Sequence, residues 1–574
     1  MNRNSDSSNR SGSIKKSNFL KDLIIFLIPI VIFLYYLHVY DPGILTVDSY
    51  NQLHQIATKQ YTNWHPFFHT LIEKACIKIY PSPVSVCVLQ ILTFSTMWAI
   101  ICRVNRNKDT GFDKQFILQV IVTLAISLIP INAIYSITLW KDILFSYFLM
   151  FLCFLIYLLL TRKCKVSYGF AIVLSGVMAI VSQLRPNGIF IILITLVILA
   201  IILYRRNKNL KLYILVPALT IIFILLIASL NVAFDVEDNQ KDAVFTKVSH
   251  MLADYDLHLD MSKEDKETLH YLIDENSIKS KYQPTYSDSI WGAANENLFN
   301  ENKAIYLEMA LRYSISNPNH FIHYILDSSP IVWDVTRDAN WVGSVYKTDI
   351  NNANRFFYSN NVTPASKYDG MMARHPGSVE YAYLNDFAYD VKDNVITDTL
   401  FDSPALYMYL AIILMILIHF ITKSKDIYVS YLPNLLNIIL VLFSTPIQDN
   451  RYLYPNLLVA YLLIIILIGL LTNRNSNPAA ESETTYDDEL PSDSRFYLEG
   501  DNTHEEAPRD KINYGKVSEK SYTHKEVPIE RINYGKLSEK SYTHKEVPRE
   551  RVNNNVVDNA EAPKEETPNN GSEN

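Results

Sequence analysis

The residues that could do chemistry in this sequence lie in short polar stretches between long apolar runs. These stretches read "TVDSYNQ" and "NWHP" early in the chain, then "LWKD", "LRPNG" and "QDNRYLYP". A carboxylate can accept a proton from a hydroxyl group, and Lys and Arg side chains can bind a phosphate. The candidates are one acid for catalysis, Asp48, and a set for substrate binding: His65, Lys141, Asp142, Arg185, Asn187, Asp449, Arg451 and Tyr452.

The early candidates also have ordinary structural explanations, which the sequence leaves open. Asp48 stands where a helix would begin, and capping a helix is a common role for Asp. His65 precedes Pro66, a residue that favours the first turn of a helix. Lys141 and Asp142 open an apolar run, where a lysine can extend its ammonium group to the membrane surface.

The later candidates are harder to assign to structure alone. Only "RPNG" separates two apolar runs at Arg185, and Gly188 allows close approach of the backbone there. Arginine suits bidentate recognition of a phosphate. Asp449 and Arg451 lie in a very short loop and could instead form a local ion pair.

Long apolar runs dominate the composition. The chain has 574 residues, of which 49% are hydrophobic, yet its mean hydropathy is only +0.05. Very apolar segments are therefore averaged with very polar ones. Runs of roughly 17 to 22 apolar residues, each long enough to cross a hydrocarbon core of about 30 Å, recur along the chain. The pattern predicts an all-α, polytopic membrane protein.

The apolar runs predict about ten transmembrane helices. An even number of crossings places both termini on the same side of the membrane. The predicted spans are 23–40, 82–102, 116–133, 143–161, 167–184, 188–204, 212–232, 404–422, 427–444 and 453–472.

Basic residues predict the orientation in the cell membrane, because Lys and Arg concentrate in short cytoplasmic loops. Both termini, which share a side with these loops, are therefore expected in the cytoplasm. The polar stretches named above, with the candidate site, are expected on the extracytoplasmic face. The basic clusters lie in the N-terminal segment 1–22 and at 103–108, 161–165, 204–211 and 422–425.

The predicted spans divide into two modules. The first, 23–232, holds about seven spans and a first outer loop at 41–81, and the second, 404–472, holds about three. Between them, 233–403 is large enough to form an extracytoplasmic domain, and its apolar residues recur at helical spacing, which predicts a mainly helical domain.

The C-terminal segment 473–574 has a different composition. It is rich in Glu, Asn, Lys, Ser and Pro and nearly free of apolar clusters, which is typical of disorder. An imperfect repeat of about 20 residues, seen in "THKEVPIERINYGKLSEKSY", has too few apolar residues to stack as a solenoid. We expect a disordered cytoplasmic tail.

The first outer loop is predicted to carry two interfacial helices. In 48–57, Ser49 and Gln52 form a capping-box pattern. In 66–80, apolar residues cover one helical face and Glu73 lies on the polar face, as in a helix that rests in the membrane interface.

Several classes of function lack support in the sequence. There is no basic stripe interleaved with aromatic residues, so nucleic-acid binding is not expected. The five cysteines lie in or beside apolar segments and predict no disulfide framework. No zinc-protease, phosphate-loop or CxxC motif is present, and no metal ligands are assigned.

This arrangement resembles the GT-C superfamily of polytopic glycosyltransferases, over roughly residues 20–472. It also resembles a bacterial family of multi-spanning proteins with the same layout. The resemblance implies a catalytic acid in the first outer loop, where Asp48 lies, and basic residues that hold a polyprenyl phosphate, a role open to Lys141, Arg185 and Arg451. Some members need a divalent metal and others do not, so the cofactor stays open.

The sequence therefore predicts an inverting, hexosyltransferase-type membrane glycosyltransferase. It would transfer a sugar from a polyprenyl-phosphate carrier in the membrane lipid to a glycan or protein acceptor of the cell envelope. Asp48 would deprotonate or orient the acceptor, and His65 and Tyr452 would line the sugar. The alternatives are a transporter or flippase of a lipid-linked or anionic substrate, and a non-enzymatic membrane scaffold.

Overall fold

The computed structural model of the protein describes residues 3–106, 114–161, 167–206, 210–238, 243–336, 379–444, 446 and 448–474. The tail predicted over 473–574 lies outside the described residues except for its first two positions. Residues 337–378, within the predicted extracytoplasmic domain, also lie outside the described residues.

The regular secondary structure of the described ranges is helical throughout, with only two isolated β-bridges. Seven helices are long and apolar enough to cross a bilayer, so the chain is a multi-pass membrane protein. They are α1 (Arg3–Val39, in its part Asn18–Val39), α4 (Val84–Asn105), α7 (Lys141–Thr161), α9 (Gly188–Arg205), α10 (Leu210–Ala233), α22 (Pro404–Thr422) and α25 (Tyr454–Arg474).

The other three predicted spans are also helical but shorter or broken. The span predicted at 116–133 forms α5 (Lys114–Leu128) and α6 (Pro130–Ser136), which are bent by 70°. The bend follows from Pro130, whose ring disfavours a helical conformation at the preceding residue, and that residue is extended here.

The remaining two predicted spans, 167–184 and 427–444, fall short of the length expected for a crossing. The first forms α8 (Tyr168–Leu184). The second forms α23 (Asp426–Ser430) followed by α24 (Leu432–Phe443). Pro433 at the start of α24 lacks a backbone N–H, which favours a new helix start there.

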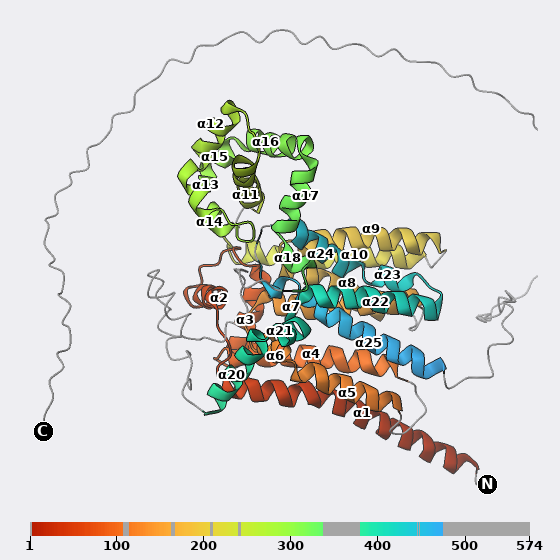
Figure 1. The fold of residues 1–574 in the computed structure, drawn as a ribbon. Coiled ribbons are helices and arrows are strands. Elements are labelled where there is room, and N and C mark those ends of the chain that lie inside the picture. Colours follow the sequence, from red (N-terminus) through yellow and green to blue (C-terminus); the bar gives the residue numbers. More distant parts are fainter. Residues whose placement is uncertain are drawn as a thin grey trace, which may run out of the picture. The chain divides into compact units, whose positions relative to one another are not determined.

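Helix α7 lies at the centre of the bundle. It packs against α4, α8, α23, α24 and α25, and every residue from Asp142 to Leu160 except Phe148 is buried. A helix that is apolar on all sides is expected to be enclosed by other helices. The long helices run beside one another in Figure 1. The first turn of α7, with Lys141 and Asp142, is therefore held rigidly by its neighbours.

The segment 41–81 forms the two helices that the sequence predicts, α2 (Val47–Thr58) and α3 (Phe67–Ile79). The predicted capping box of Ser49 and Gln52 is wrong. Thr46 is the residue that caps α2, and its backbone N–H donates to the Ser49 hydroxyl at 3.0 Å. Gln52 instead donates to the Thr70 hydroxyl on α3 at 2.9 Å, which joins the two helices.

A second group of helices follows α10 and surrounds its own apolar core, with Phe245, Leu252, Tyr255 and Phe299 fully buried. Its arrangement is visible in Figure 1. The group comprises α11 (Ala243–His258), α12 (Lys263–Leu272), α13 (Glu275–Lys281), α14 (Asp288–Trp291), α15 (Glu296–Glu301), α16 (Lys303–Ser316) and α17 (Pro318–Asp327).

Three more helices then lead back to the bundle, α18 (Pro330–Trp333), α20 (Val379–Asp393) and α21 (Val395–Asp402). Gln448, in the loop after α24, links α18 and the residues just before it to the membrane helices. Its side-chain amide accepts from the Ile331 N–H at 3.0 Å and donates to the Ser328 carbonyl at 3.0 Å.

The short turn between α8 and α9 depends on a glycine. A Cβ added at Gly188 would lie 2.3 Å from the Val181 carbonyl oxygen, whereas one added at Gly176 meets nothing within 4 Å. We expect Gly188→Ala to destabilise the protein by about 1–3 kcal/mol through overpacking. Gly176→Ala is the matched control, and it should leave stability unchanged or raise it slightly.

Thermal unfolding in detergent measures this difference. Equal melting temperatures for the two variants would contradict the close approach at Gly188.

Candidate functional site

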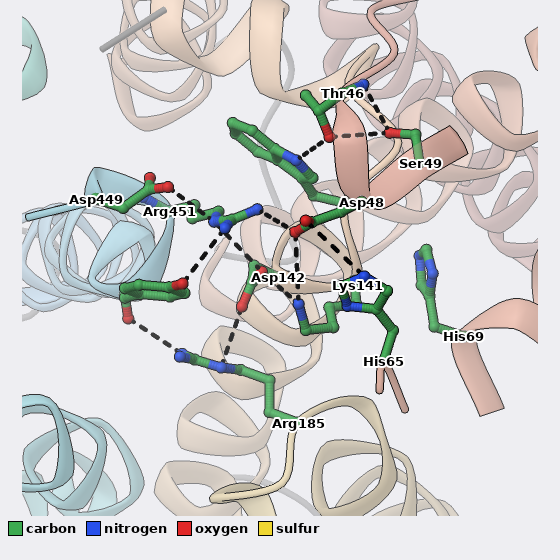
Figure 2. Close-up of polar contacts among 12 residues, drawn as sticks. Thr46, Asp48, Ser49, His65, His69, Lys141, Asp142, Arg185, Asp449 and Arg451 are labelled. Carbon is green, nitrogen blue, oxygen red and sulfur yellow. Dashed lines mark hydrogen bonds and ion pairs between the residues drawn. The ribbon is translucent and has the colours of Figure 1, made fainter. Parts of the chain in front are cut away.

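Five junctions between helices bring their polar side chains together, as Figure 2 shows. They are the start of α2, the segment between α2 and α3, the α6–α7 and α8–α9 connections with their flanking turns, and the 3-10 helix η2 (Asn450–Tyr452). We call the charged residues gathered here the ion cluster: Asp48, Lys141, Asp142, Arg185, Asp449 and Arg451.

Backbone pairing attaches the start of α2 to the start of α7. Gly43 has a φ of +113°, a conformation that favours glycine, and it turns the chain so that Ile44 pairs with Thr138. The Ile44 N–H donates to the Ile137 carbonyl at 2.8 Å, and the Leu139 N–H donates to the Ile44 carbonyl at 3.2 Å. Asp48 is thereby held beside Lys141.

Side chains reinforce this attachment. The Trp140 indole N–H donates to the Thr46 hydroxyl at 2.7 Å, and the Ser49 hydroxyl donates to the Leu139 carbonyl at 2.8 Å. The Arg451 guanidinium also lies over the Trp140 ring, with the Arg451 Cζ atom 4.7 Å from the ring centroid. The tryptophan of "LWKD" thus connects α2, α7 and η2.

Arg451 is the centre of the ion cluster. Its Nη1 lies 2.7 Å from Asp48 Oδ2, and its Nε lies 2.9 Å from Asp449 Oδ2 and 3.9 Å from Asp142 Oδ2. Asp449 also caps η2, because its carboxylate accepts from the Arg451 backbone N–H at 3.1 Å. The local Asp449–Arg451 pair therefore exists, and Arg451 reaches two further carboxylates besides.

Asp142 is fully buried and depends on two cations. Arg185 Nε lies 3.1 Å from Asp142 Oδ1, and Lys141 Nζ lies 3.5 Å from Asp142 Oδ2. Arg185 also donates to the Tyr452 carbonyl at 3.3 Å and lies over the Tyr452 ring. Asn437 on α24 donates to the same carbonyl at 3.1 Å, so Arg185 joins the α8–α9 turn to η2 and α24.

Lys141 is the least committed cation of the cluster. Its Nζ lies 4.0 Å from Asp48 Oδ2, beyond hydrogen-bond distance, and 3.5 Å from Asp142. An ammonium group has three N–H donors and rotates freely about its stem. Of the three cations, Lys141 can turn to an incoming anion with the smallest loss of existing contacts.

Charges balance within the ion cluster, which has three carboxylates and three cations. An anionic substrate would therefore have to displace a carboxylate from a cation rather than meet an empty basic pocket. A divalent metal does not fit this donor set, because every carboxylate lies within 4.0 Å of a Lys or Arg nitrogen that would repel it.

Asp48 is the cluster's most accessible acid, with its side chain 25% exposed. Burial acts to raise the pKa of Asp48, but the nearby charges of Arg451 and Lys141 outweigh it and hold that pKa below its ordinary value. Asp48 is therefore an ionised acceptor at neutral pH.

His65 faces Asp48, with Nε2 3.8 Å from Asp48 Oδ1. Burial, assisted by the charge of Lys141, lowers the pKa of His65 to about 4. The ring is neutral at neutral pH and can accept or donate a hydrogen bond.

A second polar group next to the ion cluster was not predicted as a site. His69 and Glu73 on α3 are both fully buried, with His69 Nδ1 3.6 Å from Glu73 Oε1. Neither Glu73 oxygen has a hydrogen-bond partner among the described residues. The placement of Glu73 on the solvent-facing side of this helix is thus wrong. Its spacing from His69, one helical turn, was the available signal.

Burial also determines the charge of this pair. It raises the pKa of Glu73 well above its ordinary value and lowers the pKa of His69 to about 3. His69 is therefore neutral at neutral pH, and burial favours the protonated, uncharged form of Glu73.

Of the nine residues predicted for the site, Asn187 is the one that the structure does not bring to the ion cluster. It precedes α9 and is half-buried, and no hydrogen bond or ion pair of its side chain reaches the ion cluster among the described residues.

A cleft of about 640 Å³ runs beside α2, beyond Asp48 along the same helix. Asn51, His54 and Gln55 line it from α2, and Trp64 and Glu237 line it from the other side. Aromatic, amide and carboxylate groups of this kind suit a hydroxyl-rich ligand.

Comparisons with known proteins add no relationship: no family model, no curated protein and no solved structure matches this chain.

The buried ion pairs lead to a stability prediction. Asp142→Asn leaves Arg185 and Lys141 without their buried counter-charge, so we expect a loss of about 3–5 kcal/mol. Adding Arg185→Gln should restore part of the loss, because the two residues are coupled. The control Glu275→Gln removes the exposed pair with Lys279 and should leave the melting temperature in detergent unchanged. Additive losses in the double variant would contradict the coupling.

Neutral, buried histidines lead to a pH prediction. The folded-state pKa of His65, about 4, lies below the ordinary value of 6.5, so its stabilising effect is full above pH 6.5 and is lost as the pH falls toward 4. We expect His65→Gln to reduce the drop in melting temperature between about pH 7 and pH 5. The exposed His323→Gln control should leave that drop unchanged. An unchanged drop in His65→Gln would show that His65 is not buried as a neutral ring.

Proposed function

We propose that the chain is a GT-C-type membrane glycosyltransferase, which transfers a sugar from a polyprenyl-phosphate carrier to an extracytoplasmic glycan or protein acceptor. One observation carries the proposal. The acid of the first outer loop, Asp48, lies between cations from two other junctions, with Arg451 at 2.7 Å and Lys141 at 4.0 Å.

The orientation in the cell membrane belongs to the proposal. The short basic loops, such as 204–211 and 422–425, are cytoplasmic, as are both termini, and the disordered tail follows the last helix into the cytoplasm. The bent pair α5–α6 and the shorter helices α8 and α24 complete ten crossings. The ion cluster lies at the opposite ends of these helices and so faces the extracytoplasmic side.

In the proposed reaction, the carrier phosphate lies against Lys141 and Arg451. The acceptor hydroxyl donates its hydrogen to Asp48, and its oxygen forms a bond to the anomeric carbon from the face opposite the phosphate. The bond between that carbon and the phosphate oxygen breaks, so the configuration inverts. The electron pair leaves with the polyprenyl phosphate, whose charge the cations stabilise.

Because the charges of the ion cluster balance one another, binding of the substrate can raise the basicity of Asp48. In the free protein, Arg451 lowers its pKa and therefore its basicity. A phosphate that takes over a cation removes that influence, and Asp48 then accepts a proton more readily. His65 and Tyr452 line the sugar between them.

The transporter alternative is favoured by one observation, the burial of the cluster. Asp142 is fully buried, and the Arg185 and Arg451 side chains are only 10% and 13% exposed. Buried charges often mark transport pathways. Here, however, they lie at helix ends, whereas a transporter is expected to hold them at mid-membrane.

Asp48→Asn tests the proposal, because it keeps the shape of Asp48 and removes its ability to accept a proton. We expect transfer to fall on the order of 10²-fold or more. The measurement is the sugar content of cell-envelope glycans in cells expressing each variant at equal membrane levels. Asp327→Asn, at an exposed acid outside the cluster, is the control and should transfer normally.

Normal glycans with a well-inserted Asp48→Asn variant would overturn the catalytic proposal. If the glycans changed on deletion of 473–574 but not in the Asp48→Asn variant, the scaffold alternative would be favoured.

A further inference from the structure

A group of metal-binding side chains lies outside the ion cluster, in the helical domain that follows α10. Asp254 and His258 are one turn apart on α11, so they share a face of that helix. His320 comes from α17. One ligand atom from each of the three residues lies within 4.8 Å of the other two.

Present contacts show how the group is arranged. His258 Nδ1 lies 3.1 Å from Asp254 Oδ1, and His320 Nε2 lies 2.6 Å from Asp254 Oδ2. The two imidazole rings are 5.8 Å apart, centroid to centroid. One ring nitrogen of each histidine therefore points at the same carboxylate, and the two histidines come from different helices.

We propose that Asp254, His258 and His320 bind a divalent transition metal of the zinc type. Two imidazole nitrogens and a carboxylate oxygen form a three-ligand set that suits zinc, whereas Mg²⁺ and Ca²⁺ prefer oxygen ligands. Side-chain rotations that close these atoms to about 2.0–2.2 Å from a shared ion give tetrahedral coordination. The half-exposed His258 side chain leaves the fourth position open to water.

The supporting residue is Tyr282, which follows α13. Its hydroxyl donates to Asp254 Oδ1 at 2.6 Å and orients the carboxylate. Outer hydrogen bonds of this kind hold a metal ligand in its binding rotamer. A bound ion would join α11 to α17, and α17 in turn packs against α24 of the bundle.

Two features near the proposed metal site need separate comment: the charge of Lys247 and the ion pair between Asp256 and His270. Lys247 also lies on α11, and burial lowers its pKa to about 7, so its repulsion of a cation weakens as the pH rises above neutral. Asp256 makes a comparable ion pair with His270, at 3.1 Å, without a second histidine. The Asp256–His270 pair is thus a natural control for an ordinary carboxylate–histidine contact.

The test uses the full chain in detergent, purified through a tag without histidines and stripped with a chelator. Co²⁺ is the probe, because its absorption spectrum reports tetrahedral nitrogen and oxygen ligands, and Zn²⁺ should displace it. We expect one such site per chain. His320→Ala and His258→Ala should abolish it, Tyr282→Phe should weaken binding by about tenfold, and His270→Ala should leave it intact.

Thermal unfolding is the second readout. Zn²⁺ should raise the melting temperature of the wild type and of His270→Ala but not of His258→Ala, because only a bound native state is stabilised. His258 lies at an exposed helix end, so its variant is expected to fold even if His320→Ala does not. No tetrahedral spectrum in the wild type, or an unchanged spectrum in His258→Ala, would overturn the proposal.

Discussion

The contact between Arg451 and three carboxylates is the interaction on which the site depends. A buried guanidinium without counter-charges would cost several kcal/mol, so the segments that carry Asp48, Asp142 and Asp449 must converge on it. Those segments lie far apart in the chain, because Asp142 follows Asp48 by 94 residues (142 − 48) and Asp449 follows Asp142 by 307 (449 − 142). The buried central helix α7 carries Asp142, and Asp449 caps η2 beside it.

This constraint also shapes the proposed chemistry. A closed, charge-balanced cluster is stable on its own, and it gives an anion a way to act by exchange: one phosphate oxygen replaces one carboxylate oxygen on a cation. Lys141 has the longest contacts and is the natural first partner. The exchange would release Asp48, whose accessibility is the highest among the acids of the cluster. Binding of the donor and activation of the acceptor would then be linked through a single set of ion pairs.

Apolar run length was sufficient to locate the helices, because crossing a bilayer requires a minimum length that few soluble helices share. It could not show that Pro130 breaks one run, or that α8 and α24 are shorter than the others. The polar stretches were predicted to share a rim, and eight of the nine candidate residues do lie together. Their pairing could not be predicted, since it depends on which loops meet.

Local patterns misled in two places. Ser49 and Gln52 matched a capping box, but Trp140 from a distant segment positions Thr46 as the cap. Glu73 lay on the polar side of an amphipathic pattern, yet tertiary packing buries it beside His69. The His–Asp–His group of the helical domain was equally invisible, because His320 is far from Asp254 in the chain.

The central claim is that Asp48 and its cations transfer a sugar from a carrier lipid. The most direct test supplies polyprenyl-phosphate-linked sugar and envelope acceptor to isolated membranes and measures the polyprenyl phosphate released. Membranes with the wild-type chain should release it while the acceptor gains sugar, and membranes with Asp48→Asn should release little. Release equal to that of membranes lacking the chain, or equal release by both forms, would contradict the account.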